Sequence, residues 1–139
     1  MKRSIAGLFV LYLALGCREE SNPGFNELDP EQTGVRFTNQ LVESPELNIL
    51  TYLYYYNGGG VLAADFNNDT LPDLYFSANQ QADALYLNQG NMTFREVTLE
   101  AGLENADGWT TGVSHADING DGLEDLYLCQ ASGYRALEG

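Results

Sequence analysis

Basic residues are scarce in this chain. Its 139 residues include six lysines and arginines against twenty aspartates and glutamates, which gives a formal net charge of −14 at pH 7. The few basic residues are scattered and form no positive stripe for phosphates, so we expect no nucleic-acid partner. Hydrophobic residues make up 44% of the chain, which is more than a disordered acidic protein carries. These totals indicate a folded protein with at most one ordinary domain.

Histidine and cysteine are almost absent as well. The chain has one histidine, His115, and two cysteines, Cys17 and Cys129, so it lacks a Cys/His metal cluster. It also lacks a glycine-rich phosphate loop and a GxSxG motif. Ser114 adjoins His115, but neighbouring strand residues point to opposite faces, which favours a structural histidine. Cys129 lies in the apolar stretch "LYLCQA" and is predicted to be buried. We therefore expect no enzyme.

Long hydrophobic runs are missing too. The apolar stretch 5–15 has eleven residues, fewer than the roughly 20 that a helix needs to cross a bilayer. It follows Lys2 and Arg3 and precedes Gly16. This order predicts a secretory signal peptide over residues 1–16, with a buried N-terminal helix as the alternative.

The end of this stretch, "LALGC", resembles a bacterial lipobox, which implies lipidation of Cys17. A plain signal peptide with a free thiol is the alternative. Residues 17–34 are rich in proline, glycine and polar residues and are predicted to form a lipidated tether. The sequence "CREE" resembles the acidic tag of surface lipoproteins, so the predicted location is the outer face of an outer membrane, reached by secretion.

An internal repeat is the main feature of the remaining sequence. With a shift of 52 residues, "GVLAADFNNDTLPDLY" (60–75) aligns with "GVSHADINGDGLEDLY" (112–127), and ten of the sixteen positions are identical. A period of about 50 residues is typical of propellers and other repeat arrays.

Each repeat unit is predicted to be built from antiparallel strands. The first unit has candidate strands over residues 60–66, 74–79, 83–90 and 92–98, with a short hairpin turn at "NQGN" (88–91). Four short antiparallel strands form one propeller blade, and the second unit ends after two. The alternation in "VRFTNQL" (35–41) predicts one more half-buried strand. The predicted fold is therefore all-β, with about one and a half blades over residues 35–139.

The repeated acidic stretch points to a metal ion. Calcium takes six to eight oxygen ligands, and a tight loop can supply them from side chains at positions 1, 3, 5 and 9 and from the carbonyl at position 7. Carboxylates crowded into one loop repel each other, and a cation removes that repulsion. All-oxygen ligands favour calcium before magnesium. The predicted ligands are Asp65, Asn67, Asp69, Leu71 and Asp73 in the first loop, and Asp117, Asn119, Asp121, Leu123 and Asp125 in the second.

The same residues allow two alternatives to this kind of site. An EF-hand needs a glutamate at position 12 and flanking helices, but position 12 is Phe76 or Leu128 and both flanks are strand-like. The aspartates could instead form polar turns without metal by bonding to their own backbone. The second loop is predicted to be the better site, because Gly122 stands where the first loop has Thr70 and where a sharp turn favours positive φ.

The D-x-N-x-D-x-x-x-D-L pattern, together with "LYLNQGNMTFREVTLEAGL" (85–103), resembles the FG-GAP or VCBS repeats of integrin-type β-propellers. The chain also resembles the large bacterial lipoproteins related to cartilage acidic protein. The resemblance covers about residues 35–135 and implies a seven-bladed propeller with a calcium loop between the first two strands of each blade. One and a half blades cannot close such a ring, so we expect an N-terminal fragment or a piece that assembles with another protein.

These expectations favour a calcium-binding, lipid-anchored surface propeller that binds an extracellular protein or a glycan. Four tyrosines between residues 52 and 56, together with Trp109, could stack on sugar rings or a partner, but packing between blades is the simpler interpretation. Two alternatives remain open, because propeller fold does not fix function. The chain could be the non-catalytic propeller part of a larger secreted hydrolase, or a purely structural envelope protein.

Overall fold

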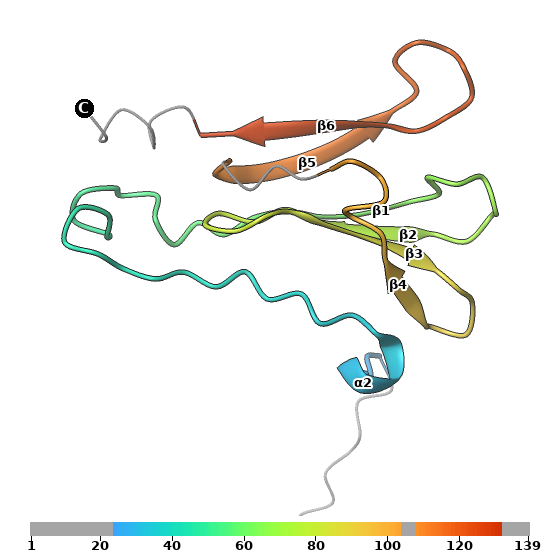
Figure 1. Ribbon diagram of the computed structural model, residues 1–139, viewed down its shortest axis with the longest axis horizontal. Coiled ribbons are helices and arrows are strands. Elements are labelled where there is room, and N and C mark those ends of the chain that lie inside the picture. The colour runs from blue at the N-terminus through green and yellow to red at the C-terminus, as the bar shows by residue number, and fades with distance from the viewer. Residues whose placement is uncertain (1–23, 104–107, 132–139) are drawn as a thin grey trace, which may run out of the picture.

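The chain forms two stacked antiparallel sheets, in a computed structural model that describes residues 24–103 and 108–131 (Figure 1). Strands β1 to β4 form sheet A in the order β1-β2-β3-β4, and β5 and β6 form sheet B. Apart from one helical turn, the elements within these described residues are strands, so the predicted all-β fold is confirmed and agrees with partial propeller blades. The elements are α2 (Pro30–Thr33), β1 (Val61–Ala64), β2 (Asp73–Phe76), β3 (Ala84–Asn88), β4 (Phe94–Glu96), β5 (Thr110–Ala116) and β6 (Asp125–Gln130).

The sequence repeat is also a structural repeat. In β1 and β2, Ala64 pairs with Asp73, and 52 residues later Ala116 pairs with Asp125 in β5 and β6. The same residue types thus occupy the same register in both units. The predicted hairpin turn between β3 and β4 is also present, closed by the Gln89 N–H, which donates to the Thr93 carbonyl at 2.8 Å.

The main core lies between the two sheets. Tyr75, Leu85 and Val97 of the first unit are buried. Apolar side chains of β5 and β6 pack against them, namely Val113, Leu126 and Leu128. A buried side chain of this size stabilises the fold by roughly 1.5–3 kcal/mol, so this cluster is what holds sheet B on sheet A.

A second core joins the segment before β1 to the start of β5. Leu47, Tyr55 and Trp109 are buried together, and Tyr52 meets Trp109 edge to face with ring centroids 5.3 Å apart. The packing interpretation therefore holds for three of these aromatics. Tyr54 and Tyr56 are 62% and 60% exposed.

The strand predicted over residues 35–41 is wrong. Its side chains alternate between half-buried and exposed as expected, but the segment pairs with no strand in the described part of the chain. It crosses the face of sheet A that is turned away from sheet B, where Phe37 stacks on Phe76 at 5.0 Å. The Asn39 side chain donates to Asn79 Oδ1 at 2.8 Å. Contacts with a sheet face impose the same two-residue period as pairing with a sheet edge.

Two further features differ from the sequence-based picture. Cys129 is exposed, not buried, because it alternates with Leu126 and Leu128, which pack on sheet A, and so lies on the other face of β6, which no layer covers within the described residues. Within the predicted tether, Pro30–Thr33 forms one helical turn, capped by the Asp29 side chain, which accepts from the Glu31 N–H at 2.9 Å. The predicted signal peptide and Cys17 lie outside the described residues. Among the residues that are described, no helix has the length and apolarity to cross a membrane.

Candidate metal centre

The first acidic loop, residues 65–73, joins β1 to β2 and is organised by its own side chains. Asp65 accepts the N–H groups of Asp69 at 3.1 Å and Thr70 at 2.8 Å. The Asn67 Oδ1 accepts the same Asp69 N–H at 3.0 Å. The Asn67 amide donates to Asp69 Oδ2 at 2.9 Å. The side chains at positions 1, 3 and 5 therefore converge on one another.

The second loop, residues 117–125, joins β5 to β6 and repeats this scheme. Asp117 accepts the N–H groups of Asp121 at 3.1 Å and Gly122 at 2.9 Å. Asn119 accepts the Asp121 N–H and donates to the Asp121 carboxylate, both at 2.9 Å. One contact is added, because the Gly120 N–H also donates to Asp117 at 2.7 Å. Equal spacing in sequence thus gives equal local geometry in both loops.

Both loops turn through two residues with positive φ. They are Asn68 (59°) and Thr70 (70°) in the first loop, and Gly120 (76°) and Gly122 (85°) in the second. Glycine adopts this conformation freely, whereas a β-branched residue is strained in it. The expected positive φ at position 6 is therefore confirmed, and the first loop carries strain that the second lacks.

Replacing Thr70 by glycine is expected to stabilise the protein by about 1 kcal/mol, because the left-handed conformation costs roughly 1–2 kcal/mol for a residue with a side chain. The reverse change, Gly122→Thr, should destabilise it by a similar amount. No atom lies within 4 Å of a Cβ added at Gly122, so the backbone alone would carry that cost. Denaturant unfolding of both variants in chelator measures the effect. Equal stability of Thr70→Gly and the parent protein would contradict it.

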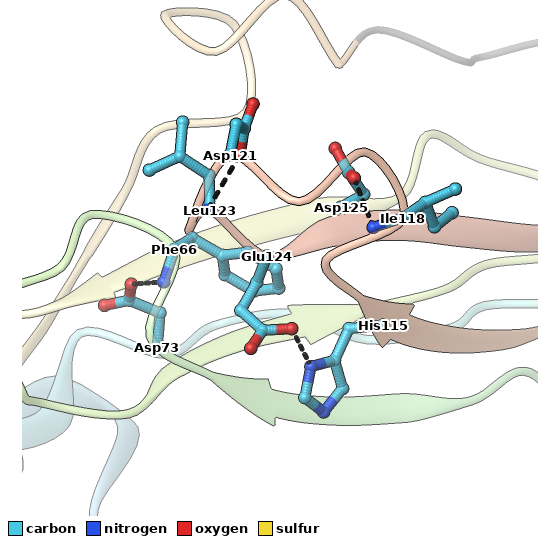
Figure 2. A network of polar contacts seen from close by, with 8 residues as sticks. All are labelled: Phe66, Asp73, His115, Ile118, Asp121, Leu123, Glu124 and Asp125. Carbon is cyan, nitrogen blue, oxygen red and sulfur yellow. Dashed lines mark hydrogen bonds and ion pairs between the residues drawn. The ribbon is translucent and has the colours of Figure 1, made fainter.

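The closing aspartates at position 9 differ between the loops. Asp73 is 0% exposed, and its carboxylate accepts the Phe66 N–H at 3.0 Å and the Asn88 N–H of β3 at 2.8 Å. Asp125 is half-buried and accepts the Ile118 N–H, which is equivalent to the Phe66 N–H, at 3.0 Å. Figure 2 shows the Phe66–Asp73 bond and the Ile118–Asp125 bond. The Asp73 carboxylate therefore ties its loop to the third strand of its sheet, which sheet B lacks among the described residues.

Hydrogen bonding lowers the pKa of Asp117 below its ordinary value, chiefly through the Gly122 N–H and also through those of Gly120 and Asp121. A lowered folded-state pKa stabilises the protein above the unfolded-state pKa of about 3.9, and this stabilisation is lost as the pH falls through the folded-state value. The stability difference between the parent protein and Asp117→Asn should therefore be constant at neutral pH and shrink below about pH 4. Unfolding curves in chelator at several pH values test this. A difference that grows on acidification would contradict it.

The two loops bring together only part of their predicted ligand sets. The side chains at positions 1, 3 and 5 meet around shared N–H groups, whereas the position 9 aspartates bond to the backbone of position 2. The leucines at position 7 contribute through their N–H groups, which donate to Asp69 and Asp121. Within residues 24–103 and 108–131, no three acidic, histidine or cysteine side chains lie close enough together to hold a metal ion.

The chemistry of the donor set nevertheless suits a hard cation. Every predicted ligand atom is a carboxylate, amide or carbonyl oxygen, and the loop backbones already hold three of the side chains together. Such oxygens match the preference of calcium and not that of zinc or copper. Calcium binding by these ten residues stays a prediction.

Two polar side chains outside the acidic loops, His115 and Asp83, have partners that the sequence did not indicate. The His115 Nδ1 lies 2.6 Å from a carboxylate oxygen of Glu124 (Figure 2). The structural role of the histidine stays a prediction. Asp83 is buried and accepts the Tyr75 hydroxyl at 2.9 Å and the Ala78 N–H at 2.7 Å. Burial and the bond to Asp83 raise the pKa of Tyr75 far above its ordinary value.

Asp83 was missed because the signal used to find candidate acids was the repeat. It lies outside the two aligned segments 60–75 and 112–127. When an acidic residue is not part of a repeat, its sequence position alone does not show whether its side chain is buried or exposed.

The chain was compared with known proteins. Neither the search of curated proteins nor the search of solved structures gave a match. A protein-family model does match, and it spans both acidic loops and the strands between them. Residues 65–128 match the family of the FG-GAP-like repeat, which supports the predicted repeat family and a propeller-like binding module.

Proposed function

We propose that this protein is a calcium-binding propeller module, lipid-anchored at the cell surface, that binds an extracellular protein or a glycan and catalyses no reaction. In this proposal, calcium fixes the turns between the first two strands of each blade. These ordered turns hold in place the surface through which the module binds its partner.

The observation that carries the proposal is that the two loops share the same acidic and amide positions and the same hydrogen bonds. Two segments 52 residues apart share acids and amides at the same positions, and their side chains accept the same backbone N–H groups. A single polar turn needs no metal, but two turns that each concentrate three aspartates in nine residues carry a repulsion that a bound dication relieves. The FG-GAP-like repeat match over the same residues supports the propeller-like module.

A calorimetric titration of the full chain with calcium chloride tests the metal. We expect two calcium ions per chain, and one fewer after Asp121→Ala. Glu100→Ala is the matched control, because Glu100 is an acid outside both loops, paired with Arg95 at 2.8 Å on the surface. Absence of bound calcium, or an equal loss in the Glu100 variant, would refute the site.

The lipid anchor is tested separately. The host should incorporate a labelled fatty acid into the protein, and Cys17→Ser should abolish the label and release the protein from the membrane fraction. Cys129→Ser serves as the control, because Cys129 is a free thiol within the described fold. Label that persists in the Cys17 variant would show that this cysteine is not the anchor.

The kind of partner is addressed with a glycan array and a pull-down, each run in calcium and in chelator. Calcium-dependent retention of a defined glycan or a defined protein would support the binding module. Failure to retain either would favour a purely structural envelope protein.

A further inference from the structure

The loop before β1, residues 42–57, exposes several large apolar side chains. Leu50 is 89% exposed and Leu53 is 76% exposed. Three further side chains of the loop are exposed with them, those of Ile49, Tyr54 and Tyr56. A single exposed apolar residue is ordinary on a protein surface, but a group of them on one short loop marks a contact surface.

Most of these residues occupy the centres of two tight turns, 48–51 and 52–55. Each turn is closed by a backbone hydrogen bond between its first and last residues, at 3.2 Å in the first and 3.0 Å in the second. The central positions of turns are usually taken by glycine, proline, asparagine, aspartate or serine. Here they hold four large apolar residues, called the apolar tip below: Ile49, Leu50, Leu53 and Tyr54.

The apolar tip is held in place by buried and hydrogen-bonded neighbours. Tyr55, between the tip and β1, is buried together with Leu47 and Trp109. The Asn48 side chain fixes the first turn, because its Oδ1 accepts the Leu50 N–H at 2.9 Å. The exposure of the tip therefore follows from how the loop is folded and not from a loose chain.

The charges beside the tip decide which partner fits it. No lysine or arginine occurs between Arg36 and Arg95, whereas Glu43 and Glu46 lie in the same loop as the tip. The Tyr56 hydroxyl donates to Glu43 at 2.7 Å, which keeps this carboxylate near the exposed aromatic ring. A negatively charged surface is repelled by these carboxylates, so apolar burial must drive the contact.

A lipid bilayer with neutral headgroups fits this combination. Leucine and isoleucine gain free energy on leaving water for the acyl-chain boundary, and tyrosine is enriched at the depth of the headgroups. The anchor in the proposed function, Cys17, would hold the chain at a membrane. The twelve residues 18–29 between this cysteine and α2 span at most about 40 Å, so the tip would meet the lipid at a high effective concentration.

The position of the tip agrees with the rest of the proposed function. Its loop leads into the start of β1, whereas the acidic loop 65–73 follows the end of β1. Figure 1 shows residues 42–57 at the left end of the sheets and both acidic loops at the right end. Docking of the tip on lipid would therefore turn the acidic loops away from the membrane, toward a partner.

We propose that the apolar tip inserts into the surface of a bilayer with neutral headgroups and so orients the anchored module, with its acidic loops facing outward. The proposal rests on the membrane location in the proposed function. The contact itself requires neither calcium nor the acyl chains on Cys17.

Cosedimentation with phosphatidylcholine vesicles tests the contact. The protein used comprises residues 18–139, which contain the whole described fold but not the apolar stretch 5–15, a stretch that would bind lipid by itself. We expect saturable binding in chelator. Replacing a third of the lipid by phosphatidylglycerol should weaken binding at least about threefold, because Glu43 and Glu46 repel the anionic headgroups, and added salt should restore part of it.

Protein variants test the position of the contact. The double variant Leu50→Ser, Leu53→Ser should bind at least about tenfold more weakly, because it removes two aliphatic side chains from the buried area. The matched control is Met92→Ser, Ile118→Ser, which removes two side chains that are 56% and 70% exposed at the opposite end of the sheets. This control should bind as the parent does. Circular dichroism checks that both double variants are folded, and the comparison of the two lipid mixtures needs no variant.

Three results would overturn the proposal. They are no saturable binding to phosphatidylcholine vesicles, equal losses in the two folded double variants, and stronger binding when phosphatidylglycerol is added. Sedimentation equilibrium without vesicles checks for a competing occupant. A dimer that the Leu50, Leu53 variant dissociates would assign the tip to a second copy and would also overturn the proposal. Because Cys17 is absent and chelator is present, none of these failures bears on the lipidation or calcium tests.

Discussion

Replacing Asp73 by alanine is expected to lower the free energy of unfolding by about 3 kcal/mol in the absence of metal. The Asp73 carboxylate is fully buried and accepts two backbone N–H groups, from Phe66 and Asn88. Bonds to a charged acceptor contribute roughly 1.5–3 kcal/mol each, and a buried donor left unsatisfied costs about 1–3 kcal/mol. The loss would loosen the first loop and its attachment to β3 together.

Asp125→Ala is the matched control for this change. It is the equivalent residue in the second unit, but it is half-buried and accepts one N–H, that of Ile118. We expect a loss of about 1 kcal/mol there, because the remaining donor can turn to water. Urea unfolding in chelator measures both variants without a contribution from calcium. Equal losses would show that burial and the β3 contact do not stabilise the first loop.

Saturating calcium is expected to raise the melting temperature by about 10 °C or more. A ligand at 100 times its Kd stabilises the folded state by about 2.7 kcal/mol per site, and 1 kcal/mol shifts the melting temperature of a domain this size by roughly 4–8 °C. Added chelator should reverse the gain. Differential scanning calorimetry with and without calcium measures it, and identical transitions would count against both sites.

The two loops should not share this gain equally. Asp121→Ala is expected to remove more of it than Asp69→Ala, although both residues occupy position 5. Glycines hold the positive φ values of the second loop, whereas Asn68 and Thr70 hold those of the first. Strain in the first loop opposes the geometry that ligation needs. A larger loss in the Asp69 variant would reverse the predicted ranking.

The fold was predictable where the sequence repeats itself. The two aligned segments predicted two equivalent hairpins, and β1–β2 and β5–β6 share one register. The actual strands are shorter than predicted; for example, β1 ends at Ala64, because the loop residues bond to side chains and not to a ladder. The predicted positive φ at position 6 followed from the contrast of Gly122 with Thr70.

The segment 35–41 shows where sequence reasoning stops. Its alternation correctly predicted half-buried side chains, because any extended chain that lies on a surface buries every second residue. Whether that surface is a strand edge or a sheet face depends on residues elsewhere. Here Phe37 meets Phe76, so the segment covers a face and forms no ladder.

Cys129 is a second case in which the sequence did not predict the surroundings of a residue: it was expected to be buried and is exposed. An apolar strand predicts a buried side chain only if both faces of the sheet are covered. Sheet B has sheet A on one face, where Leu126 and Leu128 pack, and Cys129 and Tyr127 point away from it. The sequence of a strand does not show how many layers of structure cover it.

The sequence alone determined the repeat, the strand-loop-strand units and the side chains that organise each acidic loop, because these depend on residues within a few positions of one another. Only the tertiary structure decided which copy of each repeated residue is buried. Asp73 and Tyr75 lie beneath partners from distant residues, while Asp125 and Tyr127 lack them among the described residues. Burial depends on what packs above a side chain, and two similar local sequences can differ in that respect.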